Sequence, residues 1–593
     1  MKVRVPVIVK DPEVTAYKEV APTETIEIDE EFFLDGPING RVAVLDFDEA
    51  TGDLMPGTRF VAPARDRVVG RYDVPDAPVD LKSRDITRVS VFGSIFKTIQ
   101  MYEEPDALGR PIRWAFDGPQ LLVVPRAGDW RNAYYQRESR SLQFFFFTPN
   151  PGQLILTSHS QDIVTHETAH AILDGIAPDL YDATLPQSLA IHEAVADLTA
   201  VLAAFRSRDL ANRVLAQNGG SIRKSNAFNG IAEQFGEALG RSSLRDLLNE
   251  KTLADVDASE PHALSEVLSG ALYKSVVFLH DDLTREYSST GQPDPKLMSH
   301  AEVRQMARQE PEVARAYDEA PTGGVPPAVA PPKAPLPPQA AAEKALWIAA
   351  QRFKRTLFRG LDYLPPGEVS FADFGRAILA ADAASHPESD QQREWIRDEF
   401  VRRGISAVPG DLVVPTNYEE PAVAGLDLDA VVDSDWLAYD FANRNRGLLG
   451  IPAELPFVVL PRLAVVKKYY HQEGETTVKE CLFKVSWTRV EPNRAGNGLP
   501  PTRRVAVGTT LAIDWASKRI RARLTTLTGA QEAGQRDVFL KRLVEEDLLA
   551  ADDTTVTVGG RLPVGRPRGE TAGGVLRVRG TACMLHMVEE AVS

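Results

Sequence analysis

The chain has 593 residues, more than a single hydrophobic core normally holds, and it is expected to divide into several domains. Its apolar fraction of 43% and charged fraction of 25% are those of ordinary globular proteins. The net charge of −16 argues against nucleic acid and anionic membranes as partners.

The first residues have a basic start but lack the apolar core and cleavage site of a secretory signal. No stretch approaches the roughly 18 apolar residues that cross a bilayer. We therefore expect a cytoplasmic protein without membrane insertion, while export by a signal-independent route stays open. The two cysteines, Cys481 and Cys583, lack the CxxC spacing of a zinc ribbon, and buried free thiols are favoured over one bridge between them.

The first part of the chain, residues 1–84, is predicted to be β-rich, with strands at Val3–Val9 and Arg41–Phe47. Apolar residues at helical spacing predict a helix at Asp85–Glu103. A strand follows at Gln120–Val124. Another is expected at Leu142–Phe147, and its four phenylalanines predict that it packs on a core or lines a groove.

The next part is mainly helical. Helices are predicted at Ser158–Gly175, Ser188–Arg206 and Ala263–Leu283. Gly175 is expected to stop the first of them, because glycine accepts the left-handed conformation that often ends a helix. Residues 319–342 are dense in proline and alanine and are expected to form an extended, solvated linker.

Beyond this linker the helical pattern resumes at Glu343–Leu361 and Phe371–Arg403. After Pro409 the character changes to long strand-like runs, which indicate a separate α+β domain. These runs are Phe457–Tyr470, Thr477–Val490 and Arg504–Asp514.

The predicted fold class is therefore α+β and multidomain. We expect a β-rich N-terminal region at 1–84, an α/β lobe at 85–180, a mainly α lobe at 181–405 that the Pro/Ala-rich linker interrupts, and an α+β C-terminal domain at 406–593. The sequence assigns the C-terminal domain no role beyond that of a candidate surface for a protein partner.

The helix predicted at Ser158–Gly175 contains His166-Glu167-Thr168-Ala169-His170. Residues four apart on a helix project from one face, so both imidazoles can reach one metal ion. Glu167 is turned partly aside, where it can touch a metal-bound water without being a ligand. The alternative is a helix with two surface histidines that bind no metal.

The following helix carries His192, Glu193 and Asp197. A catalytic zinc has three protein ligands and an open position for water, and His166, His170 and Glu193 make that set. Asp197 is then free to accept the other ring N–H of a zinc histidine, unless it belongs only to an exposed acidic face. We predict one zinc ion.

At these residues the sequence resembles the thermolysin-like gluzincin metallopeptidases, over roughly residues 85–405. The resemblance implies a two-lobed zincin fold with a mainly α second lobe. It also implies that Tyr181 steadies the tetrahedral intermediate, and that Asn132 and Ala133, in Asn132-Ala133-Tyr134-Tyr135, hold the substrate on an edge strand.

The resemblance extends to Pro261-His262, where a helix opens with a histidine that stabilises the transition state. Asp257 is implied as the residue that orients this imidazole. Arg245 is implied to grip a substrate carbonyl, with Arg241 as the competing choice.

The chain also departs from the family pattern. The interval from His170 to Glu193 is a few residues longer than in thermolysin, and His192 replaces an asparagine that supports the second zinc histidine. A histidine there predicts a pH-sensitive support for the site. The acidic loop that binds calcium in secreted relatives is not visible after Asp197, so no calcium site is predicted.

The expected function is zinc-dependent peptide hydrolysis with Glu167 as general base and His262 and Tyr181 as oxyanion donors. The resemblance implies an endopeptidase acting on peptides or proteins, with Ile163 and Leu244 as candidate pocket walls. Two alternatives stay open: an aminopeptidase, and a binding or delivery protein whose protease module is subordinate or silent.

Overall fold

The computed structural model describes most of the chain. The described residues are 1–11, 20–63, 68–74, 80–224, 226–232, 236, 243, 245–294, 297–298, 303, 334–470, 475–496, 498–549, 555–557, 563–565, 567–572 and 574–582. They form helices and several sheets, which confirms a mixed α+β architecture.

The chain opens with a four-stranded sheet in the order β2-β1-β5-β4. β1 (Lys2–Ile8) runs antiparallel to β2 (Thr23–Asp29) and parallel to β5 (Val69–Tyr72), which pairs with β4 (Phe60–Val61). Alternate β1 residues are fully buried, and this face packs on α1 (Arg84–Glu103). The strand and helix predicted here are confirmed.

A second sheet has the order β3-β6-β8-β7. Its strands are β3 (Val42–Val44), β6 (Leu121–Val124), β8 (Ser141–Phe144) and β7 (Ala133–Gln136). β3 comes from the predicted N-terminal region and the other strands from the predicted α/β lobe, so the two regions share one sheet. Within the described residues β7 pairs only with β8, which places it at the edge.

The strand predicted at Leu142–Phe147 is divided into β8 and β9 (Phe146–Asn150), which pairs with β10 (Gln153–Leu156). The division falls at Phe145, whose N–H is bonded to Asn132 O and to Thr157 Oγ1. Those bonds draw the backbone away from the β8 ladder.

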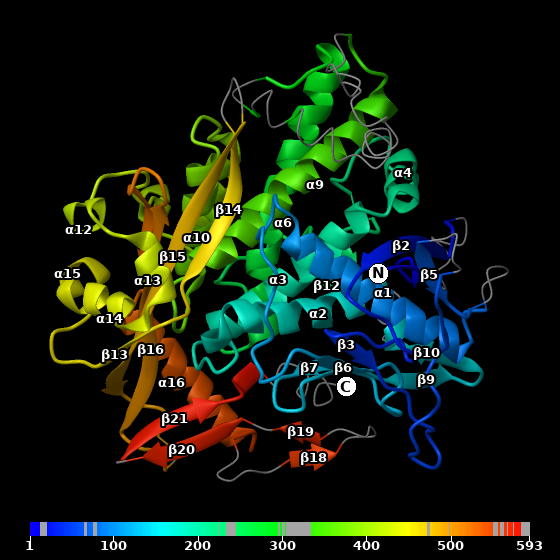
Figure 1. Ribbon diagram of the computed structural model, residues 1–593, viewed down its shortest axis with the longest axis horizontal. Helices are drawn as coiled ribbons and strands as arrows, with labels where there is room; N and C mark the ends of the chain where they lie inside the picture. Colours follow the sequence, from blue (N-terminus) through cyan, green and yellow to red (C-terminus); the bar gives the residue numbers. More distant parts are fainter. Residues whose placement is uncertain are drawn as a thin grey trace.

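Helices make up the centre of the molecule (Figure 1). α3 packs against α2 and α6, α6 packs against α9, and α9 packs against α10. The bounds are η2 Thr157–His159, α2 Gln161–Ile176, η3 Pro178–Leu180, α3 Pro186–Phe205, α4 Arg208–Gln217, α6 Pro261–Ser289, α9 Pro338–Tyr363, α10 Phe371–Ser385 and α11 Gln391–Arg402, with two short strands, β11 Gly230–Ile231 and β12 Arg245–Asp246.

α3 is the one helix of the described residues that is long and apolar enough to cross a membrane by composition, and all of it is buried inside the protein. A core helix of a folded protein has the same character, because it is surrounded by other elements.

Several predicted helices differ in their bounds, and the helix predicted at Phe371–Arg403 is divided into α10 and α11. Gly175 lies inside α2, which ends at Ile176. The position needs glycine because a Cβ there would come within 1.8 Å of Arg113 O. The Pro/Ala-rich linker does not extend to residue 342, since α9 begins at Pro338 and buries Ala341 and Ala342. Proline suits the first turn of a helix and alanine its interior. The rest of the linker lies outside the described residues.

The C-terminal region begins with short helices and continues as a seven-stranded sheet. β15 is its long central strand and pairs with β13, β14 and β16. The bounds are η4 Pro409–Leu412, α12 Pro421–Ala424, α13 Leu428–Asp433, α14 Asp435–Arg444, α15 Arg446–Leu449, β13 Phe457–Val459, β14 Leu463–Tyr470, β15 Glu475–Pro492, β16 Thr502–Asp514, β17 Ile520–Thr525, α16 Ala530–Glu545, β18 Thr555–Thr557, β19 Pro563–Gly565, β20 Arg568–Ala572 and β21 Val575–Arg579.

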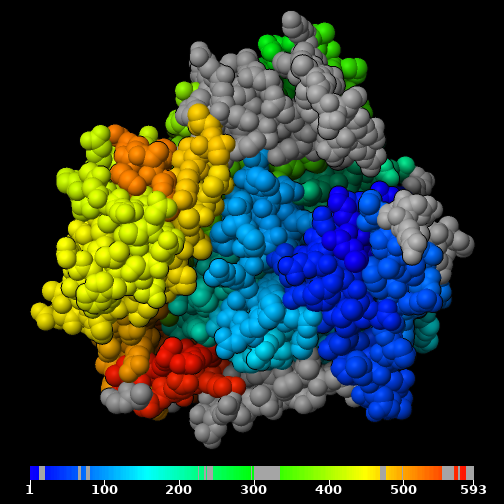
Figure 2. All heavy atoms as spheres, viewed as in Figure 1, coloured from blue at the N-terminus to red at the C-terminus, as the bar shows by residue number. Residues whose placement is uncertain are grey.

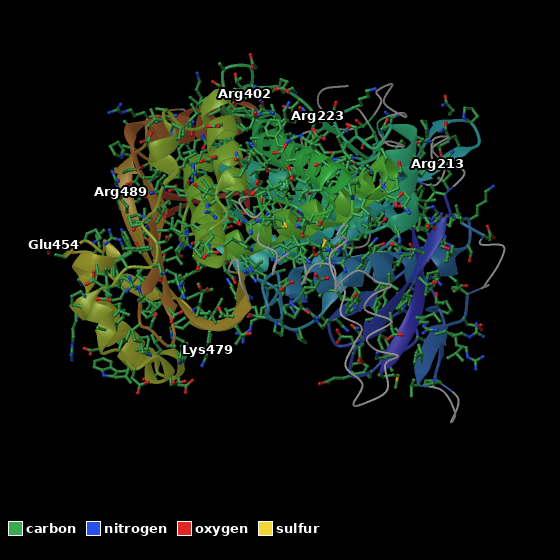
Figure 3. The ribbon with its side chains drawn as sticks, turned by 90° about the horizontal axis from the view of Figure 1, so that it is seen from above. Arg213, Arg223, Arg402, Glu454, Lys479 and Arg489 are labelled. Atoms are coloured by element: carbon green, nitrogen blue, oxygen red, sulfur yellow. The ribbon has the colours of Figure 1, made fainter. Side chains whose placement is uncertain are left out.

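This region has a core of its own, and it also contributes to the main core, in which Leu482 and Leu540 join side chains from α3 and α9. In the space-filling view, the C-terminal region (yellow to red) lies beside the first part of the chain (blue to cyan) on the face shown (Figure 2). Viewed from above, Glu454 and Lys479 of this region lie toward one end of the molecule, and Arg213 of α4 lies toward the other (Figure 3).

Candidate metal centre

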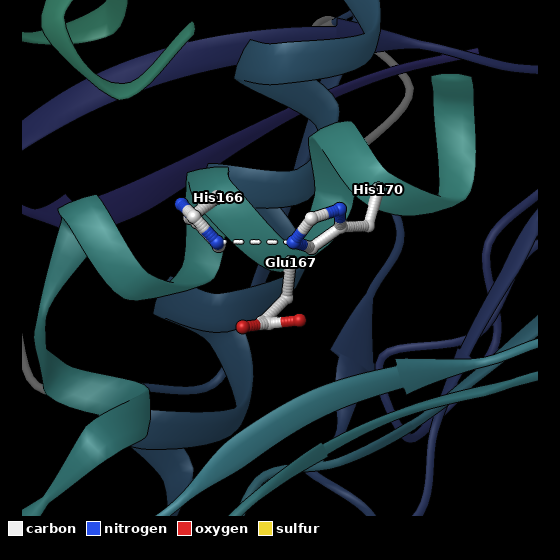
Figure 4. A group of neighbouring side chains, drawn as sticks. All are labelled: His166, Glu167 and His170. Carbon is white, nitrogen blue, oxygen red and sulfur yellow. Dashed lines mark hydrogen bonds between the residues drawn. The ribbon is translucent and has the colours of Figure 1, made fainter. Parts of the chain in front are cut away.

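α2 presents both histidines and Glu167 on one part of its surface (Figure 4). The Nε2 atoms of His166 and His170 are 3.0 Å apart. Together with a carboxylate oxygen of Glu167, ligand atoms of these residues lie within 4.8 Å of one another. All three side chains are buried, so the helix directs them into the protein and not into solvent.

α3 brings Glu193 to the same point. Its carboxylate oxygens lie 3.5 Å from His166 Nε2 and 3.3 Å from His170 Nε2. Ligands about 2.0–2.2 Å from a tetrahedral zinc are separated from one another by about 3.3 Å. The spacing of the two imidazoles and the carboxylate is compatible with one tetrahedral metal ion, and zinc as that metal stays a prediction.

Each predicted zinc histidine is held through its other ring nitrogen. His166 Nδ1 lies 3.0 Å from Asp197 Oδ1, which is the contact predicted for this aspartate. His170 Nδ1 lies 3.3 Å from His192 Nδ1, so one of these two rings donates and the other accepts. Such contacts set the tautomer and the direction of a metal-binding imidazole.

The pKa of His192 is shifted in the direction that opposes the pH sensitivity predicted for it. Burial, followed by the neighbouring His170, lowers its pKa well below 6.5. This shift favours the neutral imidazole, which can support His170 as an uncharged group.

Glu167 is placed against the edge strand, where its Oε2 accepts a hydrogen bond from the backbone N–H of Tyr135 at 3.0 Å. Burial raises the pKa of the Glu167 carboxyl to about 8. A cation at the ligand cluster would act in the opposite direction, since it favours the carboxylate form. The carboxyl can thus exchange a proton close to neutral pH, as a general base must.

Arg245 lies beside the third ligand, not apart from it. Its guanidinium pairs with Glu193 Oε2 at 3.0 Å and with Asp197 Oδ1 at 2.8 Å. Burial raises the pKa of Glu193, but the positive charges of Arg245 and His262 outweigh this effect and hold the pKa well below 4.5. This contact keeps the third ligand ionised, whereas the implied grip on a substrate carbonyl stays a prediction.

His262 opens α6 and directs its Nε2 to within 3.7 Å of Glu193 Oε2. The implied role of Asp257 in orienting this ring is wrong. The carboxylate of Asp257 accepts from the N–H and hydroxyl of Ser259, and it is Glu260 Oε1 that lies 3.1 Å from His262 Nδ1.

Glu260 is the site residue that the sequence prediction missed. It is the N-cap of α6, where its side chain accepts from the N–H groups of His262 and Ala263. Burial raises the pKa of Glu260, but the hydrogen bond from His262 outweighs this effect and lowers the pKa to about 2. An acidic residue just before Pro261 was the available signal, because acidic N-caps are common before a first-turn proline.

Tyr181 is buried at the C-cap of η3. Its hydroxyl accepts from the N–H of Arg137 and donates to Glu138 Oε2, each at 3.2 Å. The guanidinium of Arg137 covers its ring at 4.1 Å. The described contacts therefore do not bring the hydroxyl to the zinc ligands, and its predicted role as an oxyanion donor gains no support from them.

Ala133 begins the edge strand β7 and Asn132 precedes it, while their implied contact with substrate stays a prediction. Asn132 Oδ1 accepts from the N–H of Ala133 at 2.8 Å, and Asn132 O accepts from Phe145 N and Thr157 Oγ1. The asparagine thus shapes the start of the strand. Ile163 is a partly buried core residue of α2, with no contact that identifies a substrate pocket.

Three residues named in the sequence predictions, Arg241, Leu244 and Cys583, lie outside the described residues. Cys481 is described and is a buried free thiol.

Comparison with models of protein families found no match, and comparison with curated proteins found none either.

Proposed function

We propose that this protein is a zinc-dependent peptidase of the thermolysin-like type, acting as an endopeptidase on peptides or proteins. The single observation that carries the proposal is the convergence of His166, His170 and Glu193 at zinc-ligand spacing with Glu167 beside them. A structural cluster of buried histidines would not need a general base at the same point.

When bound, zinc supplies a Lewis acid that polarises the scissile carbonyl and lowers the pKa of water towards ~7. Glu167 takes the proton of the attacking water and passes it to the leaving nitrogen. The N–H of Tyr135 keeps this carboxylate turned toward the edge strand while it does so.

His262 is the group that we assign to the developing oxyanion, a donor typically worth about 3 kcal/mol in the transition state. Glu260 holds the opposite ring nitrogen and stabilises the protonated ring. The position of β7 at the edge of its sheet, within the described residues, supports the choice of a peptide substrate, because an extended peptide can bind along an edge strand.

The test is to measure zinc content and cleavage of unfolded casein for the wild-type chain, Glu167→Gln and His166→Ala. We expect one zinc per chain and cleavage that phenanthroline blocks. Glu167→Gln should keep zinc and lose turnover, whereas His166→Ala should lose both.

Glu394→Gln is the matched control, since Glu394 is an exposed helical glutamate on α11 and should leave zinc content and rate unchanged. A wild-type chain that binds no zinc would refute the proposal, as would a Glu167→Gln variant with undiminished turnover.

A further inference from the structure

Helix α16 of the C-terminal region touches two elements that carry the candidate metal centre. It packs against α3, which provides Glu193, and it reaches the turn before His262 at the start of α6. In Figure 1 it lies between the C-terminal sheet and the central helices. Arg536 makes one connection and Arg542 makes the other.

The first connection runs through Glu368. Arg536 is fully buried and donates from Nε to Glu368 Oε2 at 2.7 Å. The same carboxylate accepts from Leu185 N at 2.9 Å and from Thr184 Oγ1 at 3.0 Å. Leu185 is the N-cap of α3, and its side chain makes no capping hydrogen bond. Glu368 therefore supplies an acceptor at that end of the helix.

The chain around Glu368 is tied to the same turn of α3. Ser188 donates to Val369 O at 2.9 Å, and Gln187 accepts from Phe371 N at 2.8 Å. Glu193 lies eight residues after Leu185, which is about 12 Å along a helix. A tilt of a few degrees at the N-terminus would therefore move the Glu193 carboxylate by about 1 Å, and displacements of that size cost about 100-fold in rate.

The second connection runs through Ser259. Arg542 NH1 donates to Ser259 O at 3.1 Å, while Asp257 accepts from the N–H and hydroxyl of the same serine. Ser259 is thus held from both sides, immediately before Glu260. Because Glu260 both caps α6 and orients His262, the position of this turn decides where the imidazole points.

We propose that Arg536 and Arg542 of α16 are positioning residues of the metal centre, which makes the C-terminal region a component of the peptidase and not a separable recognition domain. The inference rests on the proposed function. Arg536 acts on the zinc ligand Glu193 through Glu368 and the start of α3. Arg542 acts on His262 through Ser259 and Glu260.

The two arginines should have different effects, because only one of them acts on a zinc ligand. In the full-length chain, Arg536→Gln is expected to weaken zinc binding about 10-fold, the lower end of the range for groups that orient metal ligands. Arg542→Ala is expected to leave zinc affinity unchanged and to lower kcat about 10-fold with little change in KM, because His262 acts in the transition state. Arg542→Lys retains a donor and should recover part of the rate.

Lys541→Ala is the matched control, because Lys541 adjoins Arg542 on α16, is exposed and pairs with Glu545 on the same helix. Zinc affinity is measured by competition with a chromogenic chelator, and thermal unfolding reports the fold of each variant. If Arg536→Gln fails to fold, Glu368→Gln and Arg542→Ala test the same two connections.

Variants with the zinc affinity and kcat of Lys541→Ala would overturn the inference while leaving an active, zinc-binding wild type as proposed. A rise in KM with unchanged kcat in Arg542→Ala would also overturn the inference, since that result would indicate a role in substrate binding. A wild-type chain that binds no zinc would overturn both proposals.

Discussion

Individual residues around the candidate metal centre are held by partners that lie close in the sequence as well as far from it. His262 takes its orientation from Glu260, two residues earlier, and His166 takes its own from Asp197 on the next long helix. Each contact occupies the ring nitrogen that faces away from the ligand cluster. These contacts therefore fix the direction of both rings.

Glu260→Gln tests the orientation of His262. The amide keeps an acceptor for the helix N-cap but loses the charge beside Nδ1, and charge-assisted hydrogen bonds are about twice as strong as neutral ones. We expect kcat to fall about 10-fold with zinc content unchanged, measured by single-turnover cleavage and metal analysis. Asp257→Asn is the control, and a Glu260→Gln variant with undiminished kcat would contradict the assignment of Glu260.

His159 offers a pH test away from the metal ligands. It is buried before α2, with Nε2 2.8 Å from Thr87 Oγ1, and burial lowers its pKa to about 4. The unfolded chain takes up this proton near pH 6.5, so acid favours unfolding between pH 6.5 and 4 by up to about 3 kcal/mol. Above pH 6.5 this contribution to stability is complete.

We expect the free energy of urea unfolding to fall more steeply from pH 7 to 4 in the wild type than in His159→Gln. Other carboxyl and imidazole groups titrate equally in both proteins, so the difference between the two curves isolates His159. Parallel curves would contradict the assignment.

Helices carry the site, and their crossings decide where its groups meet. α2 supplies two predicted ligands and the general base, α3 supplies the third ligand, and α6 supplies His262. At Gly175, near its C-terminal end, α2 touches the backbone of Arg113 so closely that a methyl group has no room. Close packing of this kind fixes the direction of the helix.

Gly175→Ala tests this contact. Overpacking at a buried crossing costs on the order of 1–3 kcal/mol, and the resulting shift of α2 should also weaken zinc binding. Gly534→Ala in α16 is the opposite case, because a Cβ there meets no atom within 4 Å and should stabilise the helix by about 0.5–1 kcal/mol. Thermal unfolding and chelator competition measure both; equal shifts in the two variants would contradict the packing argument.

At the scale of the whole molecule, buried charges join the central helices to the C-terminal sheet. Asp362, at the end of α9, accepts from Arg110 at 2.6 Å and lies 3.5 Å from Lys467 Nζ of β14. Beside it, Tyr363 donates to Glu480 of β15 at 3.0 Å. Removing one side of such a contact would leave a buried charge unpaired, which costs about 3–5 kcal/mol.

A chain truncated after Ser406 should therefore not keep the fold of the centre. We expect it to lose zinc binding and much of its helical circular dichroism, because Asp362 and Glu368 lose their C-terminal partners together. Limited proteolysis of the full chain should release no stable fragment ending near this residue. A truncated chain that binds one zinc would contradict this view of the C-terminal region.

Local patterns in the sequence predicted most of the helices and the residues that could bind a metal ion. Apolar spacing placed α1 and α3 to within two residues of their ends, since helix periodicity is a property of neighbouring residues. The same rule put His166 and His170 on one face. Asp197 lies four residues after Glu193 on the same helix face, which predicted its contact with one of the two histidines, and the structure shows that this histidine is His166.

Only the tertiary structure decided which distant segments meet. β3 joins the sheet of β6, Glu260 replaces Asp257 beside His262, and α16 reaches α3 through Glu368. Such contacts depend on how elements cross in space, and short-range periodicity carries no information about them. The sequence by itself therefore determined the candidate chemistry of the centre, while the packing of the chain decided which residues hold it in place.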